Sequence, residues 1–234
     1  SNGSRVRWGE SCRGIVSEVG VMQARTDDEV VAQEGEAEKG LVIERRFTTA
    51  GADPFDAFDW IEMSVEIRNP DGSLAHEIHG VQLPSGFAGV PGKVCAQKYL
   101  RKAGVPAALR KVAEDGVPGW LQRSEPDHEK LQTLAPEDRF VGETDGRELF
   151  RRLAGTWTYW GWTHGYFASE ADARAFYDEM AYLIASQRSA PNSPQWFNTG
   201  LNWAYGITGP AQGHHYVDAV TGELNLSEDA YTHP

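Results

Sequence analysis

Cysteine is scarce in this 234-residue chain, where only Cys12 and Cys95 occur and no C-x-x-C pair is formed. Two widely separated cysteines supply neither a disulfide framework nor a thiolate zinc site. Apolar runs are short as well, because none approaches the roughly 18 residues that a membrane-spanning helix needs. The N-terminus also has no signal-peptide core. The sequence therefore predicts a cytoplasmic protein with no membrane partner.

Basic residues are outnumbered, with 22 Lys and Arg against 34 Asp and Glu, which gives a formal net charge of −12. This excess of negative charge argues against nonspecific binding to nucleic-acid backbones, so we expect no nucleic-acid partner. It still allows a single nucleotide to bind in a locally basic pocket. The chain also lacks a G-x-G-x-x-G fingerprint, a phosphate-binding loop with lysine and a nucleophile elbow, so these motifs carry no function here.

Aromatic residues are plentiful, and eight tryptophans with a hydrophobic fraction of 40% predict a folded globular protein. Three large aromatics fall in one short stretch, APNSPQWFNTGLNW at 190–203. Pro191 and Pro194 predict that no helix runs through this stretch. We interpret it as a rigid loop that presents Ser193 or Asn192 inward. The alternative is a buried turn whose side chains are simply satisfied.

Alternation of apolar and polar residues predicts a strand at 61–68. The sequence Asn-Pro-Asp-Gly at 69–72 has turn chemistry, and 73–83 returns as the partner strand of a β-hairpin. A smaller hairpin is expected to pair 216–217 with 223–226. Residues 41–49 are typical of an extended segment.

Helical patterns predict four helices, at 92–102, at 105–115, at 145–160, and from Ser169 to a point before Pro191. The second opens with a proline in its first turn. Thr144 is the expected N-cap of the third helix, while Ser169 and Asp172 form a capping-box pattern at the fourth. The last two helices are expected to form an antiparallel pair that delivers the chain into the Asn-Ser-Pro loop.

These elements predict four segments: a flexible leader at 1–40, a hairpin and helix region at 41–102, a linker or surface excursion at 103–143, and a C-terminal segment at 144–234. The leader is rich in charge, glutamine, alanine and glycine, which is typical of a loosely attached tail. The linker is rich in proline, glycine and charge. The last segment contains the helical pair and the Asn-Ser-Pro loop.

Potential metal ligands gather near the C-terminus, namely His214, His215, Asp218, Glu228, Asp229 and His233. Imidazole with carboxylate suits zinc or iron. However, adjacent histidines in a strand point to opposite faces, so His214 and His215 cannot readily share one ion. No H-E-x-x-H or facial-triad spacing occurs either. We therefore expect no metal site.

Other reactive groups also have simpler interpretations. Glu143, Asp145 and Asp172 lie at helix starts, where carboxylates cap free amides and favour the positive end of the helix dipole. Cys95 is expected to be a small buried side chain rather than a reactive thiol.

The chain closely resembles the N-terminal region of adenosylcobalamin-dependent (class II) ribonucleotide reductases in three stretches: LVIERRFTTAGADPFDAFDW at 41–60, AGTWTYWGWTHGYF at 154–167, and APNSPQWFNTGLNWAYGITGPAQGHHYVD at 190–218. The resemblance extends over residues 40–234 and is weakest across 103–140. Its specific part is the pattern N-S-P-x-W-F-N-x-G, because a helix followed by proline and glycine is commonplace.

The resemblance implies an α+β fold, in which a mainly helical N-terminal domain with a β-hairpin leads into a ten-stranded α/β barrel that is absent from this chain. It implies reduction of ribonucleotides to deoxyribonucleotides by a thiyl radical, which homolysis of adenosylcobalamin generates. The serine of Asn-Ser-Pro binds substrate in that family. Ser193 is therefore the substrate contact that the resemblance implies, with Asn192 and Pro194 holding its hydroxyl in place.

The resemblance places no catalytic residue in this chain, because the family's first redox cysteine lies just beyond the counterpart of Pro234. It implies that the C-terminal remainder of the reductase is a partner, either in the same polypeptide or as a separate chain. An oligomer is left open. The isolated chain is expected to be inactive. The alternative is a non-catalytic interaction or regulatory module derived from the reductase N-terminal domain.

Overall fold

The computed structural model describes residues 40–68, 70–218 and 221–231. The chain divides into two units, Ser1–Ala37 and Glu38–Pro234, and the described residues all belong to the second. The predicted flexible leader, 1–40, therefore lies outside the described residues except for its last position. The described part is an α+β fold with four two-stranded antiparallel sheets.

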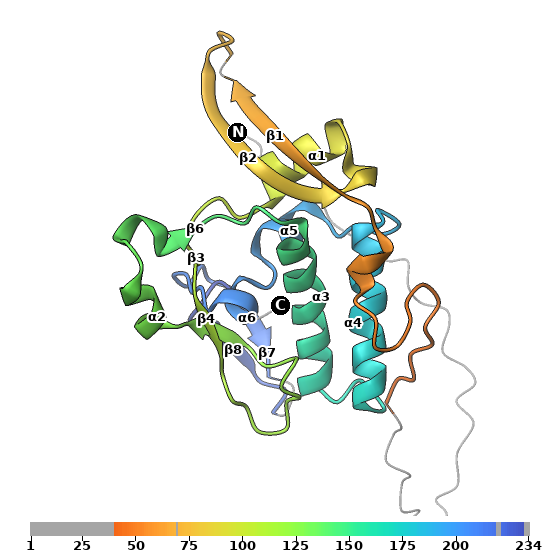
Figure 1. The fold of residues 1–234 in the computed structure, drawn as a ribbon. Helices are drawn as coiled ribbons and strands as arrows, with labels where there is room; N and C mark the ends of the chain where they lie inside the picture. The colour runs from red at the N-terminus through yellow and green to blue at the C-terminus, as the bar shows by residue number, and fades with distance from the viewer. Residues whose placement is uncertain (1–39, 69, 219–220, 232–234) are drawn as a thin grey trace, which may run out of the picture. The chain divides into compact units, whose positions relative to one another are not determined.

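Two long helices, α3 (Gly146–Thr163) and α4 (Glu170–Ala185), pack side by side as the predicted antiparallel pair (Figure 1). The predicted N-cap of α3, Thr144, is wrong by one residue. Asp145 caps the helix, because Glu148 stands three residues after it and completes a capping box. Ser169 caps α4 as expected, with its hydroxyl accepting a hydrogen bond from Asp172 N at 3.2 Å.

Carboxylates of α4 hold the extended segment 41–49 against the helix. Asp172 accepts a hydrogen bond from Ile43 N at 2.9 Å and another from the Ser169 hydroxyl, so its carboxylate ties a distant segment to the first turn of α4. Glu179 accepts hydrogen bonds from three consecutive amides, those of residues 46–48. Buried Asp178 pairs with Arg45 at 2.8 Å.

The predicted β-hairpin is confirmed as β1 (Trp60–Arg68) and β2 (Leu74–Pro84). Its base docks on the start of α3, where Gln82 N donates to Thr144 O at 2.9 Å. The inner face of the hairpin joins the α3–α4 pair in one hydrophobic core. Its fully buried members include Val65, Val81, Leu83, Leu149, Phe150, Leu153 and Ile184.

The helix predicted at 92–102 forms from 90 to 99, as α1 (Val90–Val94) continued by a π-helical turn, Cys95–Tyr99. The helix predicted at 105–115 is wrong. Two strands occupy this range, β3 (Val105–Pro106) and β4 (Leu109–Lys111). They pair with β6 (Phe140–Val141) and β5 (Ser124–Pro126), respectively. Because these partner strands are distant in sequence, the local residue pattern does not reveal the pairing.

No single helix runs through 190–203, as predicted, but the interpretation of this stretch as a loop is wrong. This stretch contains α5 (Ser193–Asn198) and the start of α6 (Leu201–Tyr205). Pro194 is tolerated because it lies in the first turn of α5, where its missing amide has no helical partner to lose. Gly200, with φ of 86°, separates the two helices.

The remaining elements are α2 (His128–Thr133) and a C-terminal hairpin of β7 (His215–Val217) and β8 (Leu224–Leu226). This hairpin confirms the smaller one predicted from the sequence. The segment 103–143 thus contains α2 and four of the short strands. None of the helices in the described ranges combines the length and hydropathy that a membrane span requires.

Gly155 allows α3 to approach the indole of Trp203, and its substitution by alanine tests this contact. A Cβ at Gly155 would lie 2.1 Å from the indole ring, which is held by a 2.9 Å hydrogen bond from its Nε1 to Leu121 O. Alanine normally stabilises a helix interior by roughly 0.5–1 kcal/mol, but overpacking costs about 1–3 kcal/mol. Gly155→Ala should therefore lower the free energy of unfolding, measured by urea denaturation.

Gly119→Ala is the matched control, because a Cβ added at Gly119 would meet no atom within 4 Å. Its stability should stay close to that of the unaltered chain. A Gly155→Ala variant as stable as the unaltered chain would show that Trp203 does not pack against α3 in this way.

Candidate functional site

The Asn-Ser-Pro sequence forms the start of α5. Asn192 is the N-cap, and its side-chain oxygen accepts a hydrogen bond from Ser193 N at 2.9 Å. Ser193 and Asn192 are both exposed, so the predicted inward orientation is wrong. The reason is that α5 turns Trp196 toward the core, at 6% exposure, and its first turn toward solvent. The role of these two residues in binding substrate stays a prediction.

An aromatic stack supports α5. The ring of Tyr99 stacks on Trp196, with 5.1 Å between centroids and an interplanar angle of 15°. Phe197 contacts the same tyrosine ring at 5.7 Å. The indole Nε1 of Trp196 donates a hydrogen bond to Pro191 O at 3.1 Å. The segment before α5 and the helix itself are therefore fixed to one aromatic anchor.

Arg152, from the middle of α3, holds the other end of α5. Its guanidinium donates to Trp196 O at 2.8 Å and to Thr199 O at 2.7 Å. It also donates to Tyr99 O at 3.2 Å. The same group pairs with Glu143, with 2.7 Å between Nε and Oε1, and both side chains are fully buried. One charge thus joins α3, α5 and the π-helical turn.

Glu143 completes this buried network. Its carboxylate accepts hydrogen bonds from Arg101 N and from the hydroxyl of Tyr205, each at 2.7 Å. Burial, together with the neighbouring Glu143 carboxylate, raises the pKa of the Tyr205 hydroxyl, so this group stays protonated and donates. Glu143 was expected to serve the start of a helix, and that interpretation is wrong because its oxygens serve the buried network instead.

Cys95 lies in the π-helical turn and is 2% exposed, which confirms the predicted buried side chain. Burial, with a further contribution from Glu143, raises the pKa of its thiol to about 12. Of the proposed metal ligands, His233 lies outside the described residues. The others form no group of three ligands with any neighbour in the ranges that the structure describes.

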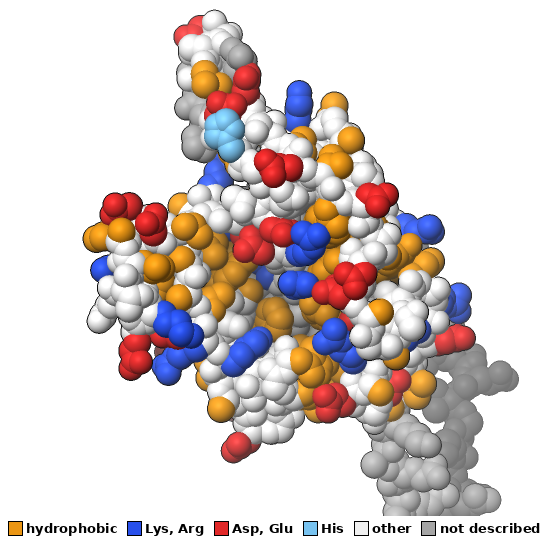
Figure 2. Space-filling model, viewed as in Figure 1, with side chains coloured by type: hydrophobic (Ala, Val, Ile, Leu, Met, Phe, Trp, Pro, Cys, Tyr) orange, Lys and Arg blue, Asp and Glu red, His pale blue; other side chains and the backbone are white. Residues whose placement is uncertain are grey.

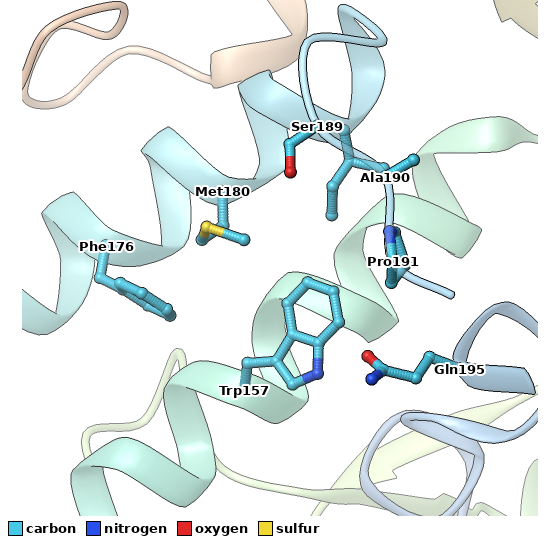
Figure 3. A pocket seen from close by; sticks show the side chains of 8 residues that line it. Trp157, Phe176, Met180, Ser189, Ala190, Pro191 and Gln195 are labelled. Atoms are coloured by element: carbon cyan, nitrogen blue, oxygen red, sulfur yellow. The ribbon is translucent and has the colours of Figure 1, made fainter. Parts of the chain in front are cut away.

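A cavity of about 270 Å³ opens beside α5 (Figure 3). Its walls are mainly apolar and come from α3, α4, the segment that links α4 to α5, and α5 itself. The lining residues are Trp157, Phe176, Met180, Ile184, Ser189, Ala190, Pro191 and Gln195. On the molecular face in Figure 2, acidic and basic side chains are interspersed, and neither sign gathers into a continuous patch.

A family model of class II vitamin B12-dependent ribonucleotide reductases matches residues 61–187, more than half of the chain. The chain belongs to this reductase family. The match includes the β1–β2 hairpin and the α3–α4 pair with Arg152. It confirms the resemblance found in the sequence.

Individual proteins similar to this chain support the same family assignment. A vitamin B12-dependent ribonucleotide reductase of Bradyrhizobium diazoefficiens is 55% identical over 192 residues, which are 82% of this chain and 15% of the relative. The Agrobacterium fabrum protein of the same name is 54% identical over the same shares. One from Streptomyces avermitilis is 32% identical over 71% of this chain and 14% of the relative. The matched part of the chain therefore spans about 15% of the length of the Bradyrhizobium and Agrobacterium relatives.

A cobalamin cofactor, which the relatives' names imply, does not fit the cavity beside α5. Pockets for drug-sized ligands measure roughly 300–1,000 Å³, and a corrin is larger than such ligands. The cavity, at about 270 Å³, is below this range. This cavity therefore forms no cobalamin site by itself.

Pattern analysis of the sequence missed Arg152, Glu143 as its partner, and Tyr99. The only local signal was an arginine placed next to the apolar stripe of α3, at a position that the structure buries completely. The contacts of Tyr99 with α5 join residues about a hundred positions apart, so no local pattern reports them.

Replacing Arg152 by methionine should destabilise the chain by about 3–5 kcal/mol, because Glu143 would remain buried without its counter-ion. Urea unfolding of the 234-residue chain measures the effect. Arg110→Met is the matched control, since Arg110 pairs with Glu125 on the surface. Such exposed pairs contribute less than about 1 kcal/mol. Equal losses for the two variants would contradict the central role of the buried pair.

Proposed function

We propose that this chain is the N-terminal part of an adenosylcobalamin-dependent ribonucleotide reductase and that Ser193 contacts the ribonucleotide substrate. Membership of the reductase family supports the first statement. The relatives, which are several times longer than this chain, are the basis for proposing that a further segment supplies the reacting cysteines. The thiyl-radical reduction belongs to that complete enzyme.

The exposed hydroxyl of Ser193 is the observation that carries the proposal. Within the described residues its oxygen has one hydrogen-bonding neighbour, the Tyr99 hydroxyl, and none in its own main chain. A hydroxyl with only this one long contact can donate to a phosphate or ribose oxygen. Asn192 caps the same turn, and Pro194 restricts its backbone. The group is therefore held in place before a ligand arrives, which lowers the entropy cost of binding.

Cys95 does not serve as a reacting thiol in this proposal, because it is buried and its pKa is raised. The purified 234-residue chain should accordingly form no deoxyribonucleotide from ribonucleotides when adenosylcobalamin and a dithiol reductant are supplied. Product formation is measured by chromatography of the nucleotides. Turnover by this chain alone would overturn the assignment of the reacting cysteines to another segment.

In the complete reductase, Ser193→Ala should lower kcat/KM because the substrate loses one hydrogen bond to a charged group. Such a bond contributes about 1.5–3 kcal/mol, which corresponds to roughly 10- to 150-fold. Steady-state kinetics with the ribonucleotide as varied substrate measure the change. Ser85→Ala is a matched control, since this serine is also exposed and does not line the cavity beside α5. An unchanged kcat/KM for Ser193→Ala would remove Ser193 from the substrate site.

A further inference from the structure

A second hydroxyl lies next to that of Ser193. The hydroxyl oxygen of Tyr99 is 3.4 Å from Ser193 Oγ, although the two residues are 94 positions apart in the chain. This distance is longer than the roughly 2.5–3.0 Å usual for a hydrogen bond between two hydroxyls, so the contact has to shorten when a ligand binds. Either oxygen is able to act as the donor.

The position of Tyr99 is fixed independently of this contact. Its ring is held by Trp196 and Phe197, and its carbonyl accepts a hydrogen bond from buried Arg152. It is also the last residue of a π-helical turn. Such turns are rare and occur frequently at functional sites. The phenol therefore reaches Ser193 from a rigid base, whereas a tyrosine on a mobile loop would have to be ordered first.

The direction of this hydrogen bond decides what Ser193 can offer a ligand. A serine hydroxyl has one proton and two acceptor lone pairs. The phosphate oxygens of a nucleotide are mainly hydrogen-bond acceptors at neutral pH. If Ser193 gave its proton to Tyr99, none would remain for such an oxygen. A phenol that donates to Ser193 Oγ leaves the serine proton available, and it strengthens that proton as a donor through hydrogen-bond cooperativity.

Building on the proposed substrate contact, we infer that Tyr99 is a positioning residue for Ser193. Its phenol donates to Ser193 Oγ and thereby directs the serine proton toward an acceptor oxygen of the ribonucleotide. Tyr99 itself acts through Ser193 and needs no direct bond to the substrate. A purely structural tyrosine would depend on its ring and not on its hydroxyl.

A double-mutant cycle in the complete reductase tests the inference, with Tyr99→Phe, Ser193→Ala and the double variant. Tyr99→Phe keeps the ring and removes one oxygen. It should raise KM for the ribonucleotide about fivefold with little change in kcat, the effect of one ordinary hydrogen bond. In the Ser193→Ala background, Tyr99→Phe should have no further effect, because the two residues act as a unit.

Tyr166→Phe is the matched control, because Tyr166 is exposed and lies in the connection between α3 and α4. Its KM should equal that of the unaltered enzyme, and thermal unfolding should show that Tyr99→Phe remains folded. An unchanged KM for Tyr99→Phe, or the same fold-change in both backgrounds, would overturn the positioning role while leaving Ser193 in the site. If Ser193→Ala itself has no effect, the proposed substrate contact fails and this inference fails with it.

Discussion

The buried ion pair of Arg152 and Glu143 determines where the Asn-Ser-Pro turn lies. Removing two charges from water is expensive, and attraction between them compensates only when the remaining donors and acceptors are also satisfied. Here they are, because the guanidinium reaches three carbonyls and the carboxylate accepts from an amide and a phenol. The prolines restrict the backbone of the turn, whereas this pair sets its position relative to α3. Loss of the arginine charge would release both α5 and the end of the π-helical turn.

The parts of the fold that local chemistry decides were predictable from the sequence. Alternation identified the β1–β2 hairpin, and helical periodicity with capping residues identified α3 and α4. Prediction failed where a distant partner decides the outcome, as at Val105–Pro106, which pairs with Phe140–Val141 across a long connection. It failed again at α5, because a proline that breaks a helix interior is favourable in a first turn.

The candidate site divides in the same way. Ser193 and Asn192 were singled out by the proline and aromatic pattern around them, and the resemblance to a family motif added the expected substrate role. Neither source says how the two residues are held. Arg152 and Tyr99 emerged only from the structure, since their partners are distant in sequence. The exposure of Ser193 also required the structure, because the stretch around it has enough aromatic residues to suggest burial. Trp196 takes the buried side of the helix and leaves the serine outside, which no local pattern reveals.

Cys95 has a consequence for the redox chemistry proposed for the complete enzyme. Thiol–disulfide exchange requires a thiolate and access to the sulfur. Because burial raises its pKa to about 12, the Cys95 thiol stays protonated at neutral pH, and its sulfur lies beneath the surface. Cys95 therefore cannot readily take part in thiol–disulfide exchange with other cysteines of the complete enzyme. It belongs to the same hydrophobic core as Trp196 of α5 without offering a thiolate that could form a wrong disulfide.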